Sequence, residues 1–347
     1  MGCVLVDLRS DTLTMPSPDM RQAMATAGLG DDVFGEDPSI SALEERGAEL
    51  MGKEAGLFVA SGTMGNLLAV LSLATRGQEV IADADAHVFM YEGGGASALG
   101  GVQIRPLASR TGVLSPEQVE AAVRPHQDVH QPITAAVCVE DTHNRHGGVC
   151  WPLEALAAIR QVADDNDLAL HIDGARIFNA AVAQGVDARA IARYADSVTF
   201  CVSKGLGAPV GSVLCGSHDL VARARRWRKM VGGGWREAGM LAGAGLYALD
   251  HMVERLAEDH ANARTLAEGL AELPGVAIDL DRVQTNLVFF DLTTMPVPEF
   301  LEACRARGLR GGGSGGRRVR FVTRFGVGPA DIQHALSVCS EVLSATA

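Results

Sequence analysis

The sequence predicts an α/β protein with a seven-stranded, mainly parallel sheet, followed by a smaller α+β domain. Seven short apolar runs alternate with segments of helical character, and this alternation is typical of a parallel sheet covered by helices on both faces. The chain has 347 residues, and single hydrophobic cores stop growing at about 250–300 residues, so a second domain is expected. The seven runs span residues 57–60, 80–82, 102–107, 135–139, 168–172, 198–202 and 212–215.

The segments between these runs carry helix signals. Residues 115–118 combine an N-cap serine, a proline at the first helical position and a glutamine that completes a capping box. Leu153, Leu156, Ile159 and Val162 recur at helical spacing, which predicts one apolar helix face. We expect these helices to be scaffold for the strand ends.

The pattern changes after residue 245, where a smaller domain is expected. The sequence there predicts a long helix to about residue 273, a strand pair near 276–280 and 286–291, and then helix, strand and helix. The glycine-rich stretch 311–316 predicts a hairpin loop or a mobile lid edge. The predicted domains are an N-terminal segment (1–30) that packs near the small domain, a large domain (31–248) and a small domain (249–347).

Composition excludes several classes of protein. The net charge of −12 argues against nucleic acid as a partner, because binding to a phosphate backbone needs a clustered positive surface. Hydrophobic residues make up 47% and charged residues 21% of the chain, as in ordered globular proteins. The chain start predicts neither a signal peptide nor a membrane anchor. The seven widely spaced cysteines favour a reducing compartment, so we expect a cytoplasmic protein with no membrane partner.

The chain contains only three lysines, and Lys204 has an unusual setting for a surface lysine. An apolar run delivers it into a glycine-rich loop that starts at Ser203, and Asp173 follows another apolar run 31 residues upstream. Pyridoxal 5′-phosphate needs a lysine to form a Schiff base with its aldehyde and a carboxylate that faces its pyridine nitrogen. Lys204 and Asp173 therefore predict this cofactor, although an isolated pair of this kind more often lies in a turn and at the surface.

A third segment supplies a candidate phosphate site. The first apolar run is followed by Ser61, Gly62 and Thr63 and then by a helical run. A strand that turns through glycine into a helix leaves free backbone N–H groups at the positive end of the helix dipole, and Thr63 adds a hydroxyl. A glycine turn alone is a weak signal. Its position before Asp173 and Lys204, in the order phosphate site, acid and amine, strengthens the prediction.

Two histidines follow predicted strands. His87 comes after the second apolar run, and His143 comes soon after the fourth. An imidazole can stack on the face of a cofactor ring and exchange protons near neutral pH, although a lone histidine is more often structural. In an open α/β sheet the ligand lies beyond the carboxyl ends of the strands, where His143, Asp173 and Lys204 are all expected. Both histidines are candidate bases, a water molecule is another, and the sequence does not choose between them.

With these motifs in place, the chain resembles the low-specificity L-threonine aldolases, which are aspartate-aminotransferase-like (fold type I) pyridoxal-phosphate enzymes. The resemblance covers nearly the whole chain and implies that residues 31–248 bind the cofactor. Phe34 replaces a tyrosine of the family and Arg324 stands where a histidine is common, which bears on substrate preference rather than on reaction type. The matching motifs are residues 7–12, 30–38, 61–66, 140–145, 173–176, 203–209, 232–236 and 319–323.

The resemblance implies a role for each candidate residue. Lys204 would hold the cofactor covalently, Asp173 would pair with the pyridine nitrogen, His87 would stack on the ring, and Gly62 and Thr63 would bind the phosphate. The full set implied to hold the cofactor is Ser61, Gly62, Thr63, His87, Asp173, Arg176, Ser203, Lys204, Lys229 and Arg236. The catalytic residues would be Lys204, His87, His143 and Asp173.

The resemblance also implies a shared active site. Ser10, Arg176 and Arg320 would face the substrate carboxylate, together with His87 and His143 on the substrate side. Arginine suits this role because its planar fork matches a carboxylate bidentately. Lys229 and Arg236 would reach the phosphate of a neighbouring subunit, which requires a homo-oligomer, with a dimer of dimers expected.

The reaction implied is cleavage of L-threonine, L-allo-threonine and related β-hydroxy-α-amino acids to glycine and an aldehyde. The alternatives are another fold type I lyase or an aminotransferase that acts on a small amino acid, a nicotinamide-dependent oxidoreductase, and a small-molecule binding protein. No Gly-x-Gly-x-x-Gly follows the first strand, which weighs against the oxidoreductase. The chemistry requires no metal, and no metal ligand set is predicted, because His171 and Asp173 share a strand end without a third ligand nearby in the sequence. A structural ion in a loop stays an open alternative.

Overall fold

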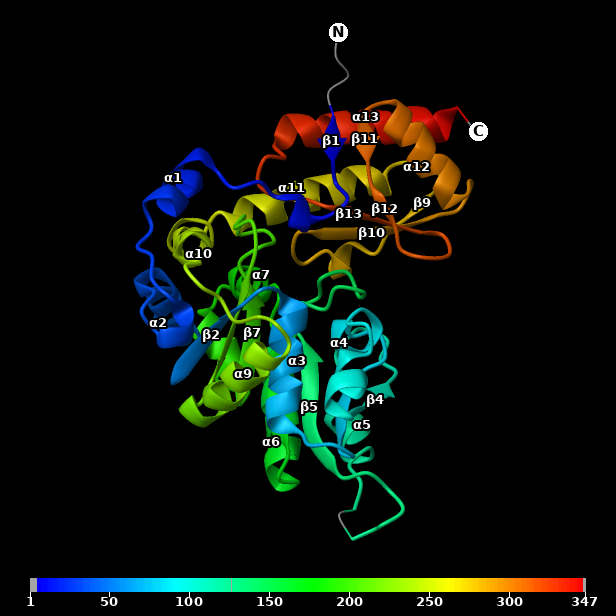
Figure 1. Ribbon diagram of the computed structural model, residues 1–347. Coiled ribbons are helices and arrows are strands. Elements are labelled where there is room, and N and C mark those ends of the chain that lie inside the picture. Colours follow the sequence, from blue (N-terminus) through cyan, green and yellow to red (C-terminus); the bar gives the residue numbers. More distant parts are fainter. Residues whose placement is uncertain (1–4, 126, 346–347) are drawn as a thin grey trace.

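The structure is a computed structural model that describes residues 5–125 and 127–345. Its centre is a seven-stranded sheet of order β2-β8-β7-β6-β5-β3-β4 (Figure 1). Only β8 runs against its neighbours β2 and β7, and the other pairs are parallel. The prediction of a mainly parallel seven-stranded sheet is confirmed. The strands are β2 (Ala55–Val59), β3 (Glu79–Asp83), β4 (Gln103–Leu107), β5 (Thr134–Glu140), β6 (Ala169–Asp173), β7 (Ser197–Cys201) and β8 (Ser212–Gly216).

Helices cover both faces of this sheet, which explains why its central strands are apolar on both sides. On one face α3 packs against β6, β7 and β8, and α9 packs against α3, β2 and β8. On the other face α2 packs against β2 and β8, and α6 packs against β6. The helices of this part are α2 (Pro38–Met51), α3 (Gly62–Leu73), α4 (His87–Met90), the π-helical turn η3 (Ala96–Gly100), α5 (Pro116–Glu120), α6 (Leu153–Asp165), α7 (Ile177–Gln184), α8 (Ala188–Ala192), α9 (His218–Met230) and α10 (Gly239–His251).

A second, four-stranded antiparallel sheet of order β12-β13-β10-β9 lies above the carboxyl ends of the large sheet (Figure 1). Its helices are α11 (Leu256–Ala271), α12 (Val297–Ala306) and α13 (Pro329–Ser344). Its strands are β9 (Val276–Ala277), β10 (Leu287–Leu292), β12 (Gly312–Gly313) and β13 (Arg318–Val322). Short elements near the chain start are β1 (Val6–Asp7), η1 (Asp11–Leu13), α1 (Pro18–Thr26) and η2 (Asp32–Phe34), and β11 (Leu309–Arg310) lies later in the chain.

Two predicted segments of this smaller part differ in the structure. The strand expected over 276–280 has only two residues, because the Asp279 carboxylate accepts a hydrogen bond from Asp281 N (3.2 Å) and caps the 3₁₀ turn η4 (Leu280–Arg282). The glycine-rich stretch 311–316 is not loop throughout. Gly312 and Gly313 form β12, which pairs with β13, and Gly315 and Gly316 lie in the turn between these two strands.

The N-terminal segment contacts both parts of the molecule. β1 pairs in parallel with β11, and Val6 and Leu8 belong to the hydrophobic core under the small sheet. α1 instead packs on α10. The core of the large part includes Leu249, Met252 and Leu256, and the core under the small sheet resumes at Ala263, so the boundary expected near residue 248 stays a prediction. Among the described residues, no helix is both long and apolar enough to cross a membrane.

Candidate active site

A cavity of about 330 Å³ lies where the carboxyl ends of β5, β6 and β7, the start of α3 and the small sheet meet. Ten of the thirteen predicted site residues line it, and His143, Lys229 and Arg236 do not. The cavity volume falls within the range of about 300–1,000 Å³ that is usual for small-molecule sites. The ten residues are Ser10, Ser61, Gly62, Thr63, His87, Asp173, Arg176, Ser203, Lys204 and Arg320.

Lys204 is half-buried in the loop after β7. Gly207 closes this loop with a φ of +81°, and its N–H donates to the Lys204 carbonyl oxygen at 2.9 Å. The other two lysines lie elsewhere. Lys53 donates to the carbonyl oxygen of Ala195, and Lys229 is exposed on α9. Lys204 is therefore the one lysine of the chain that faces this cavity.

Asp173 ends β6, and its buried carboxylate is held by hydrogen bonds. Asn66 Nδ2 donates to Oδ2 at 2.8 Å, and the backbone N–H of Ala175 donates to Oδ1 at 3.1 Å. His171 Nε2 lies 3.2 Å from Asn66 Oδ1, and His171 Nδ1 lies 2.8 Å from Ser197 Oγ. Burial lowers the pKa of His171 to about 4, so the ring is neutral and can donate from Nε2 to the amide oxygen. These contacts fix the orientation of the Asp173 carboxylate.

The N-terminus of α3 forms the predicted anion site. Ser61 is the N-cap, and its Oγ accepts from Met64 N at 3.1 Å. Two glycines let the helix approach β7 closely. A Cβ at Gly62 would lie 2.9 Å from Cys201 Sγ, and a Cβ at Gly65 would lie 2.4 Å from Thr199 Cγ2. The free N–H groups of the first turn thus lie at the cavity wall, where they can bind a phosphate.

His87 is the first residue of α4, and it faces the cavity. Its Nδ1 lies 2.8 Å from Glu92 Oε1, and its backbone N–H donates to Glu140 Oε2 at 2.6 Å. The hydrogen bond to Glu92 raises the pKa of His87. Asn66 Nδ2 also donates to Glu92 Oε1 at 2.8 Å, so the histidine and Asp173 share one hydrogen-bond network.

Two guanidinium groups converge on the substrate side of the cavity. Arg176 Nε and Nη2 donate to the two oxygens of Asp11 at 2.6 and 2.8 Å, and both residues are buried. Burial alone would raise the pKa of Asp11, but the Arg176 charge outweighs it and holds this pKa well below its usual range. Asn144 Oδ1 accepts from Arg176 Nη1 at 3.4 Å and from Arg320 Nη1 at 3.3 Å. Arg176 is thus largely occupied by Asp11, and Arg320 is the freer of the two.

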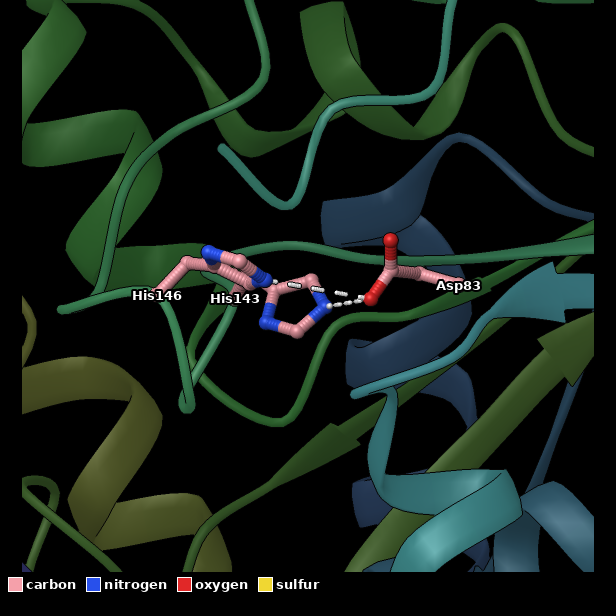
Figure 2. Close-up of side chains that lie close together, drawn as sticks. All are labelled: Asp83, His143 and His146. Carbon is pink, nitrogen blue, oxygen red and sulfur yellow. Dashed lines mark ion pairs between the residues drawn. The ribbon is translucent and has the colours of Figure 1, made fainter. Parts of the chain in front are cut away.

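His143 does not line the cavity. Its ring is fully buried beyond the end of β5, with Nε2 3.3 Å from Asp83 Oδ1 and its centroid 4.7 Å from that of His146 (Figure 2). The next residue, Asn144, takes the position at the cavity wall. The position of His87 at the cavity wall therefore favours this residue as the base. The catalytic role of His143 stays a prediction, and the position of its ring does not support that role.

Lys229 and Arg236 also lie outside the cavity of their own chain. Lys229 is exposed beside a wider surface hollow of about 880 Å³ between α2, β2 and α9. Arg236 Nη1 donates to Asp31 Oδ2 at 2.8 Å, and its side chain is 62% exposed. Both remain free to contact a second subunit.

Five residues of the site were not predicted from the sequence: Asp11, Asn66, Glu92, Glu140 and Asn144. Asn66 had a detectable signal, because it is a polar residue inside the apolar helix α3. Glu140 ends an apolar strand, and its carboxylate accepts from the N–H groups of both His87 and Asn144. The other three lie in loops or on a short turn, where no periodicity marks a buried polar side chain.

Comparisons with known proteins agree with this arrangement. The family model described as beta-eliminating lyase matches residues 7–293. The chain is 44% identical over 343 residues to a probable low-specificity L-threonine aldolase 2 of Arabidopsis thaliana, which covers 97% of each chain. It is 48% identical over 286 residues to the low specificity L-threonine aldolase of Escherichia coli (strain K12), which covers 82% of this chain and 84% of that one.

Solved structures confirm the fold. A threonine aldolase of Leishmania major matches with a TM-score of 0.83 at 21% identity, over 97% of this chain and 99% of that chain. The serine palmitoyltransferase of Sphingomonas wittichii matches with a TM-score of 0.79 at 20% identity, over 99% and 88%. The predicted aspartate-aminotransferase-like (fold type I) architecture is thereby confirmed.

Proposed function

The chain belongs to the beta-eliminating lyase family and, within it, to the low-specificity L-threonine aldolases, and on this premise we propose that it cleaves β-hydroxy-α-amino acids with pyridoxal 5′-phosphate. L-Threonine and L-allo-threonine would give glycine and acetaldehyde. The observation that carries the proposal is one cavity lined by the amine of Lys204, the carboxylate of Asp173 and the N-terminus of α3.

The residues of the cavity fit this cofactor. Lys204 supplies the amine for its aldehyde, the first turn of α3 supplies donors for its phosphate, and Asp173 supplies a buried anion for its ring nitrogen. When bound, pyridoxal phosphate supplies an electron sink for the charge left on Cα after the Cα–Cβ bond breaks. Asn66 and Ala175 hold the Asp173 carboxylate in place, where it would face the ring nitrogen of the cofactor.

Arg320 and Arg176 orient the substrate. Arg320 presents its guanidinium at the cavity wall and is braced by the Arg9 carbonyl oxygen, to which Nη2 donates at 3.0 Å. Arg176 offers its remaining donor, Nη1, beside Asn144. A substrate carboxylate held on these donors would fix the orientation of the bonds at Cα, and alignment of this kind selects the bond that breaks.

His87 is the group that we assign to the proton of the β-hydroxyl. It faces the cavity, and Glu92 holds its Nδ1, which leaves Nε2 for the substrate either directly or through one water. Loss of a general base typically costs about two to four powers of ten in rate. The same ring can also stack on the cofactor face. His87 would then both hold the cofactor in place and remove the proton of the substrate hydroxyl.

An absorbance spectrum before and after borohydride, with peptide mapping of the reduced adduct, tests the covalent assignment. We expect a visible chromophore and an adduct on Lys204, both absent from Lys204→Ala and retained in Lys53→Arg. An adduct on Lys53 or Lys229, or no chromophore, would overturn the proposal. Product analysis with L-threonine separates the alternatives, because an aldolase gives glycine and acetaldehyde, whereas elimination or transamination gives a keto acid.

The proposal includes a homo-oligomer, as a dimer of dimers, in which Lys229 and Arg236 reach the site of the neighbouring subunit. Large apolar side chains lie exposed beside these two cations in the sequence and in space. Phe34 is 73% exposed and lies two residues after Asp32, whose N–H donates to the Arg236 carbonyl oxygen. Met230, next to Lys229, is also 73% exposed. We expect the second subunit to cover these two exposed apolar side chains. We also place the protein in the cytoplasm, since the six described cysteines are all unpaired.

A further inference from the structure

Four side chains outside the active-site cavity converge at the ends of β3 and β5, and we call them the Asp83 cluster: Asp83, Asp85, His143 and His146. Asp83 is the last residue of β3, and Asp85 lies two residues further on. The two histidines lie three residues apart in the loop that follows β5. Figure 2 shows that the rings of His143 and His146 and the Asp83 carboxylate point toward one another.

The distances in this cluster are too long for good hydrogen bonds. His143 Nε2 lies 3.3 Å and His146 Nε2 lies 3.9 Å from the same oxygen, Asp83 Oδ1. His146 Nε2 lies 3.4 Å from Asp85 Oδ2. Hydrogen bonds between nitrogen and oxygen are shorter, at about 2.7–3.2 Å. One ligand atom from each of Asp83, His143 and His146 thus lies within 4.8 Å of the others without a good hydrogen bond between them.

The histidines of the cluster are also short of partners. Within residues 5–125 and 127–345, neither ring nitrogen of His143 and not Nε2 of His146 makes a hydrogen bond of acceptable geometry. His143 is fully buried, and the His146 side chain is only 12% exposed. A buried polar group normally finds a partner, because burying it without one costs free energy. An ion at the centre of the cluster would satisfy these nitrogens.

The spacing matches a tetrahedral metal site. Bonds of about 2.0–2.2 Å from zinc to nitrogen and oxygen place neighbouring ligand atoms about 3.4 Å apart in a tetrahedron. The two close contacts of the cluster are 3.3 and 3.4 Å, and one ligand atom from each of Asp83, His143 and His146 fits within 4.8 Å. Imidazole with carboxylate is a ligand set that suits zinc.

We infer that Asp83, His143 and His146 bind a divalent zinc ion, with Asp85 as the fourth ligand. Asp85 is 42% exposed and provides the route by which an ion reaches the buried nitrogens. The carboxylate of Asp83 is already oriented, because Oδ1 accepts from the Asp85 N–H at 2.8 Å. The site was missed in the sequence because its ligands come from two separate strand ends.

Arg282 is the neighbour that competes with this ion. Its Nη2 lies 3.3 Å from His146 Nδ1 and 3.3 Å from the His146 carbonyl oxygen. A donor at Nδ1 favours a proton on Nε2, whereas a metal ion requires a lone pair there. Zinc binding therefore leaves the guanidinium on the carbonyl oxygen, and Arg282→Met should raise the affinity for zinc. Arg145 also faces the cluster, with Nε 3.8 Å from Asp85 Oδ1.

The ion would brace the active site without entering it. Asn144 lies between the two histidine ligands in the chain, and its Oδ1 accepts from both arginines of the cavity. Asp83 lies four residues before His87. A zinc ion would thus tie the strand end that leads to the candidate base to the loop that carries Asn144. It is a structural site of four protein ligands, and closed sites of this kind add to folding stability.

Metal content of the untagged, cofactor-loaded protein tests the inference. Loading the cofactor occupies the cavity, which contains the other group of possible ligands, His87, Glu92 and Asp173. After incubation with zinc and dialysis against metal-free buffer, mass spectrometry of the metal should find about one zinc per chain. In His146→Gln the affinity should fall by at least about tenfold. The matched control is His130→Gln, which changes a histidine that is 89% exposed.

Two further readouts make the outcome decisive. Zinc should raise the melting temperature of the wild type and of His130→Gln but not of His146→Gln, since an ion that binds only the folded state stabilises it. Cobalt in place of zinc should give the visible bands of a tetrahedral site. Loss of all zinc from the wild type on dialysis, or equal retention by His146→Gln and Asp83→Asn, would overturn the inference. If His146→Gln does not fold, Asp85→Asn and the wild-type stoichiometry still decide it.

Discussion

The cofactor half and the substrate half of the cavity are built in different ways. In the cofactor half, Asp173 and Lys204 follow the adjacent parallel strands β6 and β7, and Asn66 reaches the acid from the helix α3 that packs on these strands. In the substrate half, Arg176, Asp11 and Arg320 come from three distant parts of the chain. The first half depends on the register of one sheet and on the helix that packs on it, whereas the second depends on how the N-terminal segment and the small sheet meet the large one.

Because of this difference, substitutions in the two halves should affect different measured quantities. A change in the cofactor half should lower the rate of the chemical step and leave the fold intact, because its hydrogen bonds lie within one rigid sheet and helix. A change in the substrate half should lower stability together with substrate affinity, because the same side chains join separate parts of the chain.

Replacing Asp173 by asparagine should have the largest effect on turnover. The amide keeps the shape but removes the charge that holds a proton on the cofactor nitrogen, and loss of one preorganised electrostatic group typically costs about 10²–10³ in rate. Steady-state assays of glycine formation measure the change, and circular dichroism with thermal melting checks the fold. Asp165→Asn, on the exposed side of α6, is the control. If Asp173→Asn instead fails to fold while the rate of the folded fraction is unchanged, the proposed difference between the two halves is wrong.

Replacing Asp11 by asparagine should mainly destabilise the protein. It leaves the Arg176 guanidinium buried without its bidentate carboxylate partner, and breaking a buried ion pair on one side typically costs about 3–5 kcal/mol. Urea unfolding measures the free energy of unfolding, and KM for L-threonine should rise in parallel. The control is Asp7→Asn, since the Asp7–Arg9 pair is partly exposed and should contribute less than about 1 kcal/mol. Equal losses in the two variants would contradict the prediction.

The same contrast explains what the sequence could predict. The seven-stranded, mainly parallel sheet was predicted from seven apolar runs, although the order of its strands was not. The ends of neighbouring strands placed Asp173 and Lys204 together, because parallel neighbours share an edge. The phosphate site was predicted because strand, glycine and helix N-terminus are contiguous in the chain. All of these signals are local or depend on sheet register.

The remaining parts of the site depend on tertiary contacts, which the periodicity of the sequence does not predict. The pairing of Asp11 with Arg176 joins residues 165 apart in the sequence. His143 was expected at the cavity because it follows a strand end, but the loop turns its ring toward Asp83 and brings Asn144 to the wall instead. The roles of Arg176 and Arg320 came from a family resemblance, which did not reveal that Asp11 already holds one of them.

Replacing Glu92 by glutamine should give the smallest effect, and it tests the contact between the two halves. The hydrogen bond from Glu92 raises the pKa of His87, so loss of the carboxylate should lower this pKa. A base must be neutral to accept a proton, and kcat/KM therefore falls on the acid side as the pH drops through the pKa of His87. In Glu92→Gln this acid-side fall should begin at a lower pH, while Glu272→Gln, an exposed control, keeps the wild-type profile. An unchanged profile, or one moved to higher pH, would exclude His87 as the base and return that role to water.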